Sequence, residues 1–342
     1  MQPAEPHTSH PVPPGSTPVA CRVARRVSAR TGWLCSLALL ACLCGSLQVV
    51  AGPTPFRILV VLSEEGPQYL RVVDALRMHL ETLCTPDCNA PLKLETVAEA
   101  KFEPAKAADF NLLLPLGRAA SMTVARRATR TRTIYALIPE GVWTEIQECC
   151  PPPLQDSSAL FLDQPIGRHL RLIRLALPQL ARVGLLVGPS SESVVSDAET
   201  AAHATGQTLV TRAVAAETEV GPQLRDLIKD ADVLLAVPDP LIYNRSSIVA
   251  ILLTTYSERV PLVGYSQAMV NAGAVLALYS TPEDVGWELA DRVGAVLSGQ
   301  PLPPSSPLRH FQVGVNREVA RSLGLDIAPD EVLIRQLGGH TP

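Results

Sequence analysis

The sequence is poor in aromatic residues and has no large excess of charge of either sign. Aromatic side chains make up 4% of its 342 residues, so Ala, Val and Leu must build most of the core. Such a core suits helices packed on parallel strands, which are buried on both faces. The formal net charge is −4. This argues against a nucleic-acid-binding protein, because phosphate binding needs clustered Lys and Arg.

Common catalytic and nucleotide-binding motifs are also missing. The first apolar run, RILVVLSEEG, lacks the G-x-G-x-x-G of a dinucleotide-binding turn, and neither G-x-x-x-x-G-K-[ST] nor G-x-S-x-G occurs. No histidine after residue 51 falls in a loop that follows a predicted strand. His169 and His203 are expected within helices, at the surface or half-buried. An enzyme on a Rossmann-like fold therefore remains only as an alternative.

Residues 1–51 have the pattern of a secretory signal peptide. Four arginines between residues 22 and 30 precede an apolar run from Trp33 to Cys44, which is shorter than the ~20 residues of a membrane span. Small residues follow, with a cleavage site after Ala51. A second possible cleavage site is Leu39-Leu40-Ala41-Cys42, which looks like a lipobox. Cleavage there would leave Cys42 acylated, and the lipid would anchor the protein to the membrane.

The cysteines support export. Four of the eight lie in the predicted signal, and the other four are Cys84, Cys88, Cys149 and Cys150. An even number in an oxidising compartment favours disulfides, so we expect bridges between the loop TLCTPDC and the loop ECCPPP. A zinc site is the alternative, but the adjacent Cys149 and Cys150 lack the usual gap between zinc ligands. We expect no metal and no cofactor.

From residue 56 onward, apolar strands alternate with amphipathic helices, which predicts an α/β fold with parallel sheets flanked by helices. The alternation restarts at SALFLD, residues 158–163, so two sets of similar size are expected, forming two Rossmann-like lobes. The strands of the first set are expected at 57–62, 92–98, 109–117 and 133–139, and the next strands of the second set at 182–188, 208–214, 232–238, 260–265 and 274–280.

Small and polar residues follow five of these strands. Loops after parallel strands leave the sheet at one edge, where ligands bind. Several of the loops lead into helices, whose first N–H groups favour anions. If the two lobes face each other, the loops surround one cleft. The candidate ligand-binding residues are Ser63, Gly117, Arg118, Ser190, Ser191, Asp239, Asn244, Tyr265, Ser266 and Tyr279.

The second half resembles the substrate-binding proteins of ABC importers, in the branch related to tryptophan- and tyrosine-binding proteins. The segments ARVGLLVGPSSES, ADVLLAVPDPLIYN and FQVGVNREVARSLGLDI carry the resemblance, and ADFNLLLPLGRAAS adds to it in the first half. The resemblance implies a periplasmic-binding-protein type I fold that closes on its ligand by hinge motion. It also implies an N-terminal lobe of residues 56–160 plus 281–300 and a C-terminal lobe of residues 161–280 plus 301–337.

The function implied is a periplasmic protein that captures a small ligand, an amino acid or a similar solute, for an ABC permease in the inner membrane. Arg118 would pair with a ligand carboxylate and Asp239 with a ligand ammonium. The segment IPEGVW departs from the family pattern, which puts amino-acid specificity in doubt. A ligand-sensing or receptor-associated binding protein without transport stays open as an alternative.

Overall fold

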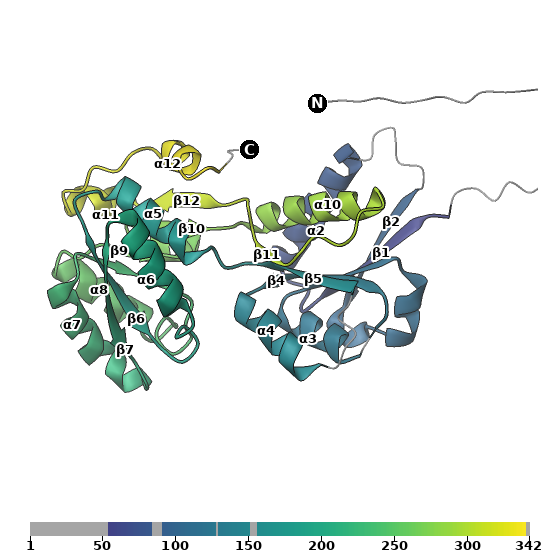
Figure 1. Cartoon of the computed structure of the whole chain (residues 1–342), viewed down its shortest axis with the longest axis horizontal. Helices are drawn as coiled ribbons and strands as arrows, with labels where there is room; N and C mark the ends of the chain where they lie inside the picture. Colours follow the sequence, from purple (N-terminus) through teal and green to yellow (C-terminus); the bar gives the residue numbers. More distant parts are fainter. Residues whose placement is uncertain (1–53, 84–90, 128, 151–155, 340–342) are drawn as a thin grey trace, which may run out of the picture. The chain divides into compact units, whose positions relative to one another are not determined.

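The computed structural model describes residues 54–83, 91–127, 129–150 and 156–339. These residues form two six-stranded sheets, each covered by helices on both faces (Figure 1). None of the helices in these ranges is long and apolar enough to cross a membrane.

The first sheet is entirely parallel, with the strand order β11-β5-β4-β3-β1-β2. Alternate residues of β1 enter different cores: Ile58, Val60 and Leu62 pack with α2 and α10, whereas Leu59 and Val61 pack with α3. Its strands are β1 (Phe56–Leu62), β2 (Leu92–Ala98), β3 (Leu112–Leu116), β4 (Arg132–Ile138), β5 (Ser157–Phe161) and β11 (Ser306–Pro307), and its helices are α2 (Pro67–Leu83), α3 (Arg118–Arg126), α4 (Glu140–Cys149) and α10 (Pro282–Leu297).

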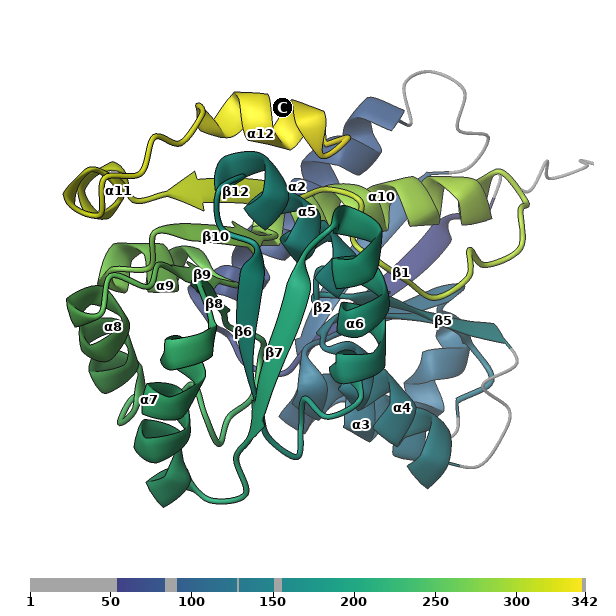
Figure 2. The same cartoon turned by 60° about the vertical axis from the view of Figure 1, so that its left-hand side comes forward.

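The second sheet has the order β12-β10-β9-β8-β6-β7, and β12 is antiparallel to β10. Helices α5 and α6 cover one face, and α7 and α8 cover the other (Figure 2). The strands are β6 (Arg182–Val187), β7 (Thr208–Ala213), β8 (Val233–Leu235), β9 (Leu262–Gly264), β10 (Leu276–Tyr279) and β12 (Gln312–Val315), and the helices are α5 (Ile166–Ala176), α6 (Val194–Thr205), α7 (Val220–Asp230), α8 (Ile248–Ser257), α9 (Gln267–Ala272), α11 (Arg317–Ser322) and α12 (Asp330–Gln336).

The strand order reverses at one place in each sheet. The reversal lies between β1 and β3 in the first sheet and between β6 and β8 in the second. The helices that follow the two strands of each reversal cover opposite faces of the sheet, and the reversal has its open edge at the carboxyl ends of the strands. In open α/β sheets this is where ligands bind.

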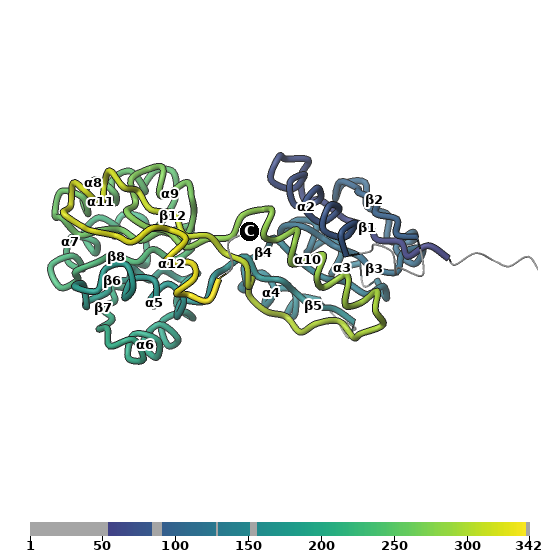
Figure 3. Tube along the Cα trace, turned by 90° about the horizontal axis from the view of Figure 1, so that it is seen from above, coloured from purple at the N-terminus to yellow at the C-terminus, as the bar shows by residue number. Residues whose placement is uncertain are grey.

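The chain passes between the two sheets three times, after β5, after β10 and after β11 (Figure 3). Side chains join these three segments to one another. The Nε2 of Gln164 donates to the Oγ of Ser280 at 2.7 Å, and the Ser280 hydroxyl donates to the carbonyl oxygen of His310 at 2.8 Å. The crossing segments are therefore linked by one chain of hydrogen bonds.

Two strands join a different sheet from the one that the sequence pattern suggested. Strand β5 pairs with β4 in the first sheet. The alternation placed β5 at the start of the second set, whereas the lobe of residues 56–160 that the resemblance implied includes all but its last residue. Strand β11 pairs with β5, although residues 301–337 were assigned to the C-terminal lobe. Hydrophobic periodicity predicts that a strand forms, but it carries no information on which neighbour the strand pairs with.

The segment IPEGVW, taken as a loop from its sequence, begins helix α4. Pro139 is the N-cap residue, and Val142, Trp143 and Ile146 are buried at helical spacing. Trp143 packs against Tyr135, with ring centroids 5.3 Å apart. This helix covers the sheet beside α3.

Candidate functional site

In the first sheet, Ser63 and Gly117 meet at the place where the strand order reverses. The Ser63 hydroxyl donates to the carbonyl oxygen of Leu116 at 2.8 Å and accepts from the N–H of Ala120 at 2.9 Å. Ser63 thus satisfies one of the free N–H groups in the first turn of α3. The two predicted residues, 54 positions apart, form one local structure.

Gly117 leaves room for the side chain of Tyr69, which was not among the candidate residues predicted from the sequence. Its φ is +83°, and a Cβ at this position would lie 2.7 Å from both the Ser63 Oγ and the Tyr69 hydroxyl. Tyr69, in the first turn of α2, was counted only as a helix residue. An aromatic residue in the first turn of a helix that follows a strand-end loop is the signal that could have pointed to it.

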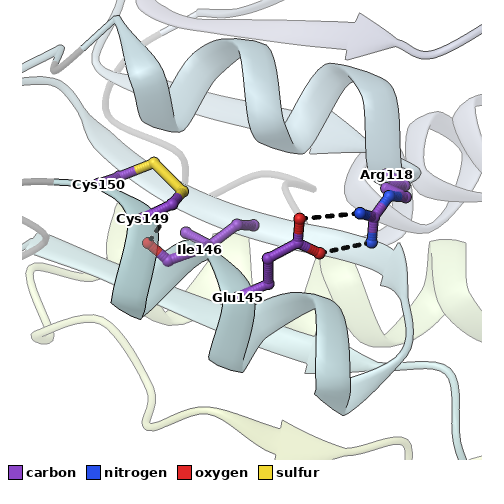
Figure 4. Close-up of a disulfide and its surroundings, with 5 residues drawn as sticks. All are labelled: Arg118, Glu145, Ile146, Cys149 and Cys150. Carbon is purple, nitrogen blue, oxygen red and sulfur yellow. Dashed lines mark hydrogen bonds and ion pairs between the residues drawn. A yellow bond between two sulfur atoms is a disulfide. The ribbon is translucent and has the colours of Figure 1, made fainter. Parts of the chain in front are cut away.

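Arg118 is held by an acid of the neighbouring helix (Figure 4). Its guanidinium makes two bonds to the carboxylate of Glu145, from Nη1 at 2.6 Å and from Nη2 at 2.8 Å. In this bidentate geometry two parallel N–H groups of the guanidinium bind the two carboxylate oxygens. The partner predicted for Arg118, a ligand carboxylate, would have to compete with Glu145.

The disulfides expected between the loop TLCTPDC and the loop ECCPPP differ from the pairing in the structure. Cys149 is joined to its neighbour Cys150 (Figure 4), so neither of them is available to Cys84 or Cys88, which lie outside the described residues. The sulfur of Cys149 is 3.8 Å from the carbonyl oxygen of Ile146. This is a contact only, because a disulfide sulfur has no proton to donate.

In the second sheet, Ser191 and Asp239 are hydrogen-bonded to each other near the corresponding strand reversal. The Ser191 hydroxyl donates to Asp239 Oδ2 at 2.8 Å, and the N–H of Leu241 donates to Oδ1 at 3.0 Å. Both Ser191 and Asp239 are 1% exposed, whereas the neighbouring Ser190 is exposed. In this conformation the Asp239 carboxylate joins two loops inside the lobe.

We expect Asp239→Asn to lower the free energy of unfolding by about 1–3 kcal/mol, because one of the two buried donors would then face an amide NH₂ group. Urea denaturation measures this. Ser190→Ala, a change at the exposed neighbour, should stay within about 0.5 kcal/mol of the unmodified protein. Equal stability of Asp239→Asn and Ser190→Ala would show that the Ser191–Asp239 bond does not stabilise the fold.

Asn244 organises the turn before α8. Its Oδ1 accepts from the N–H groups of Ser246 at 2.9 Å and Ser247 at 3.1 Å, and its Nδ2 donates to the carbonyl oxygen of Pro240 at 3.0 Å. These bonds are typical of an Asx turn. The side chain is thus engaged in local structure.

Two tyrosines stand after β8 and β9. The rings of Tyr243 and Tyr265 are 6.2 Å apart, edge to face. The Tyr243 hydroxyl is buried and has no hydrogen-bond partner among the described residues. Burial raises the pKa of Tyr243 well above its usual range, with smaller contributions from Tyr265 and Asp239. Tyr243 was not among the ligand-binding residues predicted from the sequence.

The last two candidates lie around α9. The Ser266 side chain accepts from the N–H of Met269 at 3.3 Å and is the N-cap of this helix. The Tyr279 hydroxyl donates to the side chain of Gln267. Burial is the main cause that raises the pKa of Tyr279. No group of three or more His, Cys, Asp or Glu side chains within the described ranges could hold a metal ion.

Two sheets of the same strand order, joined by three crossings, define a two-lobed α/β fold of the periplasmic-binding-protein type I. The family model described as ABC transporter substrate binding protein matches residues 162–337. The chain belongs to this family. No curated protein sequence matches the chain.

Solved structures with the same fold come from several bacteria. An ABC domain in complex with L-Trp from Streptococcus pneumonia is 18% identical, with a TM-score of 0.54, over 83% of this chain and 99% of that chain. A ligand-free, open substrate-binding protein with adhesive properties from Clostridium difficile is 16% identical, with a TM-score of 0.66, over 81% and 97%. A periplasmic ribose ABC transporter protein from Conexibacter woesei is 13% identical, with a TM-score of 0.51, over 80% and 96%.

Proposed function

We propose that this protein is an exported solute-binding protein. It captures a small ligand, an amino acid or a similar solute, between its lobes and delivers it to the permease of an ABC importer without chemical change. The observation that carries the proposal is the family match over residues 162–337. The relative that was solved with L-Trp supports an amino acid as the first ligand class to test.

The placement of polar groups supports the same function. At the strand reversals lie Ser63 and Gly117 in the first sheet and, in the second, Ser191 and its exposed neighbour Ser190. Tyr265 and Tyr279 add half-buried rings at the second sheet. A site with a few polar groups among apolar and aromatic ones suits a small solute.

Ligand binding would act on the lobes through the three crossing segments. A ligand that contacts both lobes favours the closed arrangement, which is a population shift between two states. The hydrogen bonds from Gln164 to Ser280 and from Ser280 to His310 keep the crossing segments together, so that they would move as one hinge.

Export is part of the proposal and rests on the sequence of residues 1–51, which lie outside the described residues. Removal of this segment as a signal would release the protein into the periplasm. Acylation at Cys42 would instead leave it attached to the membrane. Mass spectrometry of the protein recovered from the producing cell distinguishes cleavage after Ala51 from a lipid on Cys42.

We expect one class of small solute to raise the melting temperature of the purified protein. A ligand at 100 times its dissociation constant adds about 2.7 kcal/mol to the free energy of unfolding. The panel consists of the twenty L-amino acids, neutral sugars such as D-ribose, small anions and divalent metals. If no compound shifts the melting temperature, the proposal that the protein binds a solute of this panel is wrong. The hypothesis to test next is then that it recognises a protein partner.

A further inference from the structure

The third crossing passes from one hydrophobic core to the other within a few residues. Leu308 is buried in the core of the first lobe, and its N–H donates to the carbonyl oxygen of Phe161 in β5 at 3.2 Å. Phe311 is buried in the core of the second lobe. Arg309 and His310 lie between these two anchors. A rotation of one lobe against the other must therefore change the backbone dihedral angles between Leu308 and Phe311.

Arg309 is fixed to the first lobe. Its N–H and its Nε donate to the two carboxylate oxygens of Glu288 in α10, at 2.8 Å and 2.9 Å. The Glu288 carboxylate is buried, which makes this pair a firm attachment. The bend of the third crossing is thus confined largely to the backbone around His310, whose carbonyl oxygen accepts the hydroxyl of Ser280.

One side chain spans this bend. Arg168, in the first turn of α5, donates from Nη1 to the carbonyl oxygen of Leu308 at 3.0 Å, and its guanidinium carbon lies 4.5 Å from the centre of the Phe311 ring. Nη1 also donates to the Oε1 of Gln164 in the first crossing, and Gln164 is bonded to Ser280 in the second. The guanidinium of Arg168 is therefore connected to all three crossings.

The position of Arg168 is unfavourable for a charged group. It forms no ion pair with any carboxylate that the structure describes, and its Nε is buried without a hydrogen-bond partner among the same residues. Burial is the main cause that lowers the pKa of Arg168; the charge of Arg171 adds to this, and Glu288 acts in the opposite direction. A partly buried charge without an acid partner reduces stability. Its contacts are those of the crossings, which indicates a role in the hinge.

We propose that Arg168 is the positioning residue of the hinge. By holding Leu308 and Phe311 at a fixed separation, it narrows the range of lobe arrangements that the ligand-free protein visits. The consequence for binding rests on the proposed function: a hinge that is already restricted loses less conformational entropy when the lobes close on a solute. Loss of the Arg168 contacts would therefore weaken binding, although no candidate ligand-binding residue is changed.

Pulsed electron–electron double resonance of the ligand-free protein tests the hinge itself. Spin labels are attached through a ketone-bearing amino acid, so that the cysteines do not react, at Met78 on α2 and Val249 on α8, which are 61% and 59% exposed. Arg168→Met keeps an unbranched apolar side chain and removes the guanidinium. It should give a broader distance distribution than the unmodified protein. A pair within the first lobe, at Met78 and the exposed Arg126 on α3, should give the same distribution in both.

Isothermal titration with each of the twenty L-amino acids and with D-ribose tests the consequence for binding. Arg168→Met should bind the solute about 10-fold more weakly than the unmodified protein, because a hydrogen bond and a cation–π contact are lost. Arg171→Met is the matched control, since Arg171 is exposed three residues further along α5. It should leave the distances and the affinity unchanged. Arg168→Lys keeps the charge and one donor group, so it should give an intermediate width, and it replaces Arg168→Met if that variant does not fold.

The distances and the affinities fail in different ways. Equal interlobe distributions for Arg168→Met and the unmodified protein would overturn the proposal, as would an equal broadening in Arg171→Met. Broadening of the pair within the first lobe would show that Arg168 supports the fold itself. A broader hinge with unchanged affinity would overturn the link to binding. If neither the amino acids nor D-ribose bind, the proposed function is wrong for these solutes, whereas the interlobe distances still decide the role of Arg168.

Discussion

Gly286→Ala should lower the free energy of unfolding by about 1–3 kcal/mol, the usual range for an overpacked core. A Cβ at this position of α10 would lie 2.6 Å from the Cβ of Ala75, 2.6 Å from the carbonyl oxygen of Val72 and 2.9 Å from the N of Leu76. Two of these atoms belong to the backbone of α2, so no rotation of a side chain relieves the clash. The two helices must separate. Urea denaturation followed by circular dichroism measures the change.

Gly294→Ala, two turns further along the same helix, is the control. The nearest atom to a Cβ there is the Cδ1 of Leu83 at 3.5 Å, an ordinary contact, so the change should be neutral or stabilise by about 0.5–1 kcal/mol. Equal stability of the two variants would show that α2 and α10 do not pack as closely as described.

The stability of the protein should fall as the pH is lowered from about 6.5 towards 4, with about 2 kcal/mol lost at pH 5 through His169. Burial, and then the charge of Arg168, lower the pKa of His169 to about 4. The residue is 5% exposed, and its Nδ1 has no partner among the described residues. Below pH 6.5 the unfolded chain binds a proton that the folded protein does not accept. The folded state is therefore destabilised.

His169→Leu should remove this part of the pH dependence, because leucine does not titrate. Free energies of unfolding at pH 7.5 and pH 5 are compared for the two proteins, which cancels the contribution of the carboxylates. A loss of the same size in both would show that His169 accepts a proton in the folded protein. His169 was expected at the surface or half-buried, and its full burial in α5 is a correction made by the structure.

The sequence predicted the alternation of strands and helices well because the responsible forces act between near neighbours along the chain. The run from Ile58 to Leu62 is buried on both faces of a parallel sheet. Gly206 ends α6 in the left-handed conformation, as its place after the helix suggested. The segment of α4 was missed because Pro139 was read as the end of the strand at 133–139 and the residues after it as a loop, although proline suits the start of a helix.

The candidate site shows the same division. That Ser63 and Gly117 follow strands was visible in the sequence, and parallel pairing of β1 with β3 brings them together. The pairing of Arg118 with Glu145, 27 residues apart, depends on how α3 packs beside α4. The Ser191–Asp239 bond depends likewise on the adjacency of β6 and β8.

By itself, then, the sequence determined the α/β class, the polar residues at the strand ends and the resemblance to ABC substrate-binding proteins. These follow from hydrophobic periodicity, from turn residues and from the order of the similar segments, all of which are visible along the chain without knowledge of its folding. The tertiary structure alone decided that β11 belongs to the first sheet, that Arg118 is already paired, and that the Tyr69 hydroxyl lies near Gly117. Each of these depends on distances between elements far apart in sequence, which are set by strand order and helix packing.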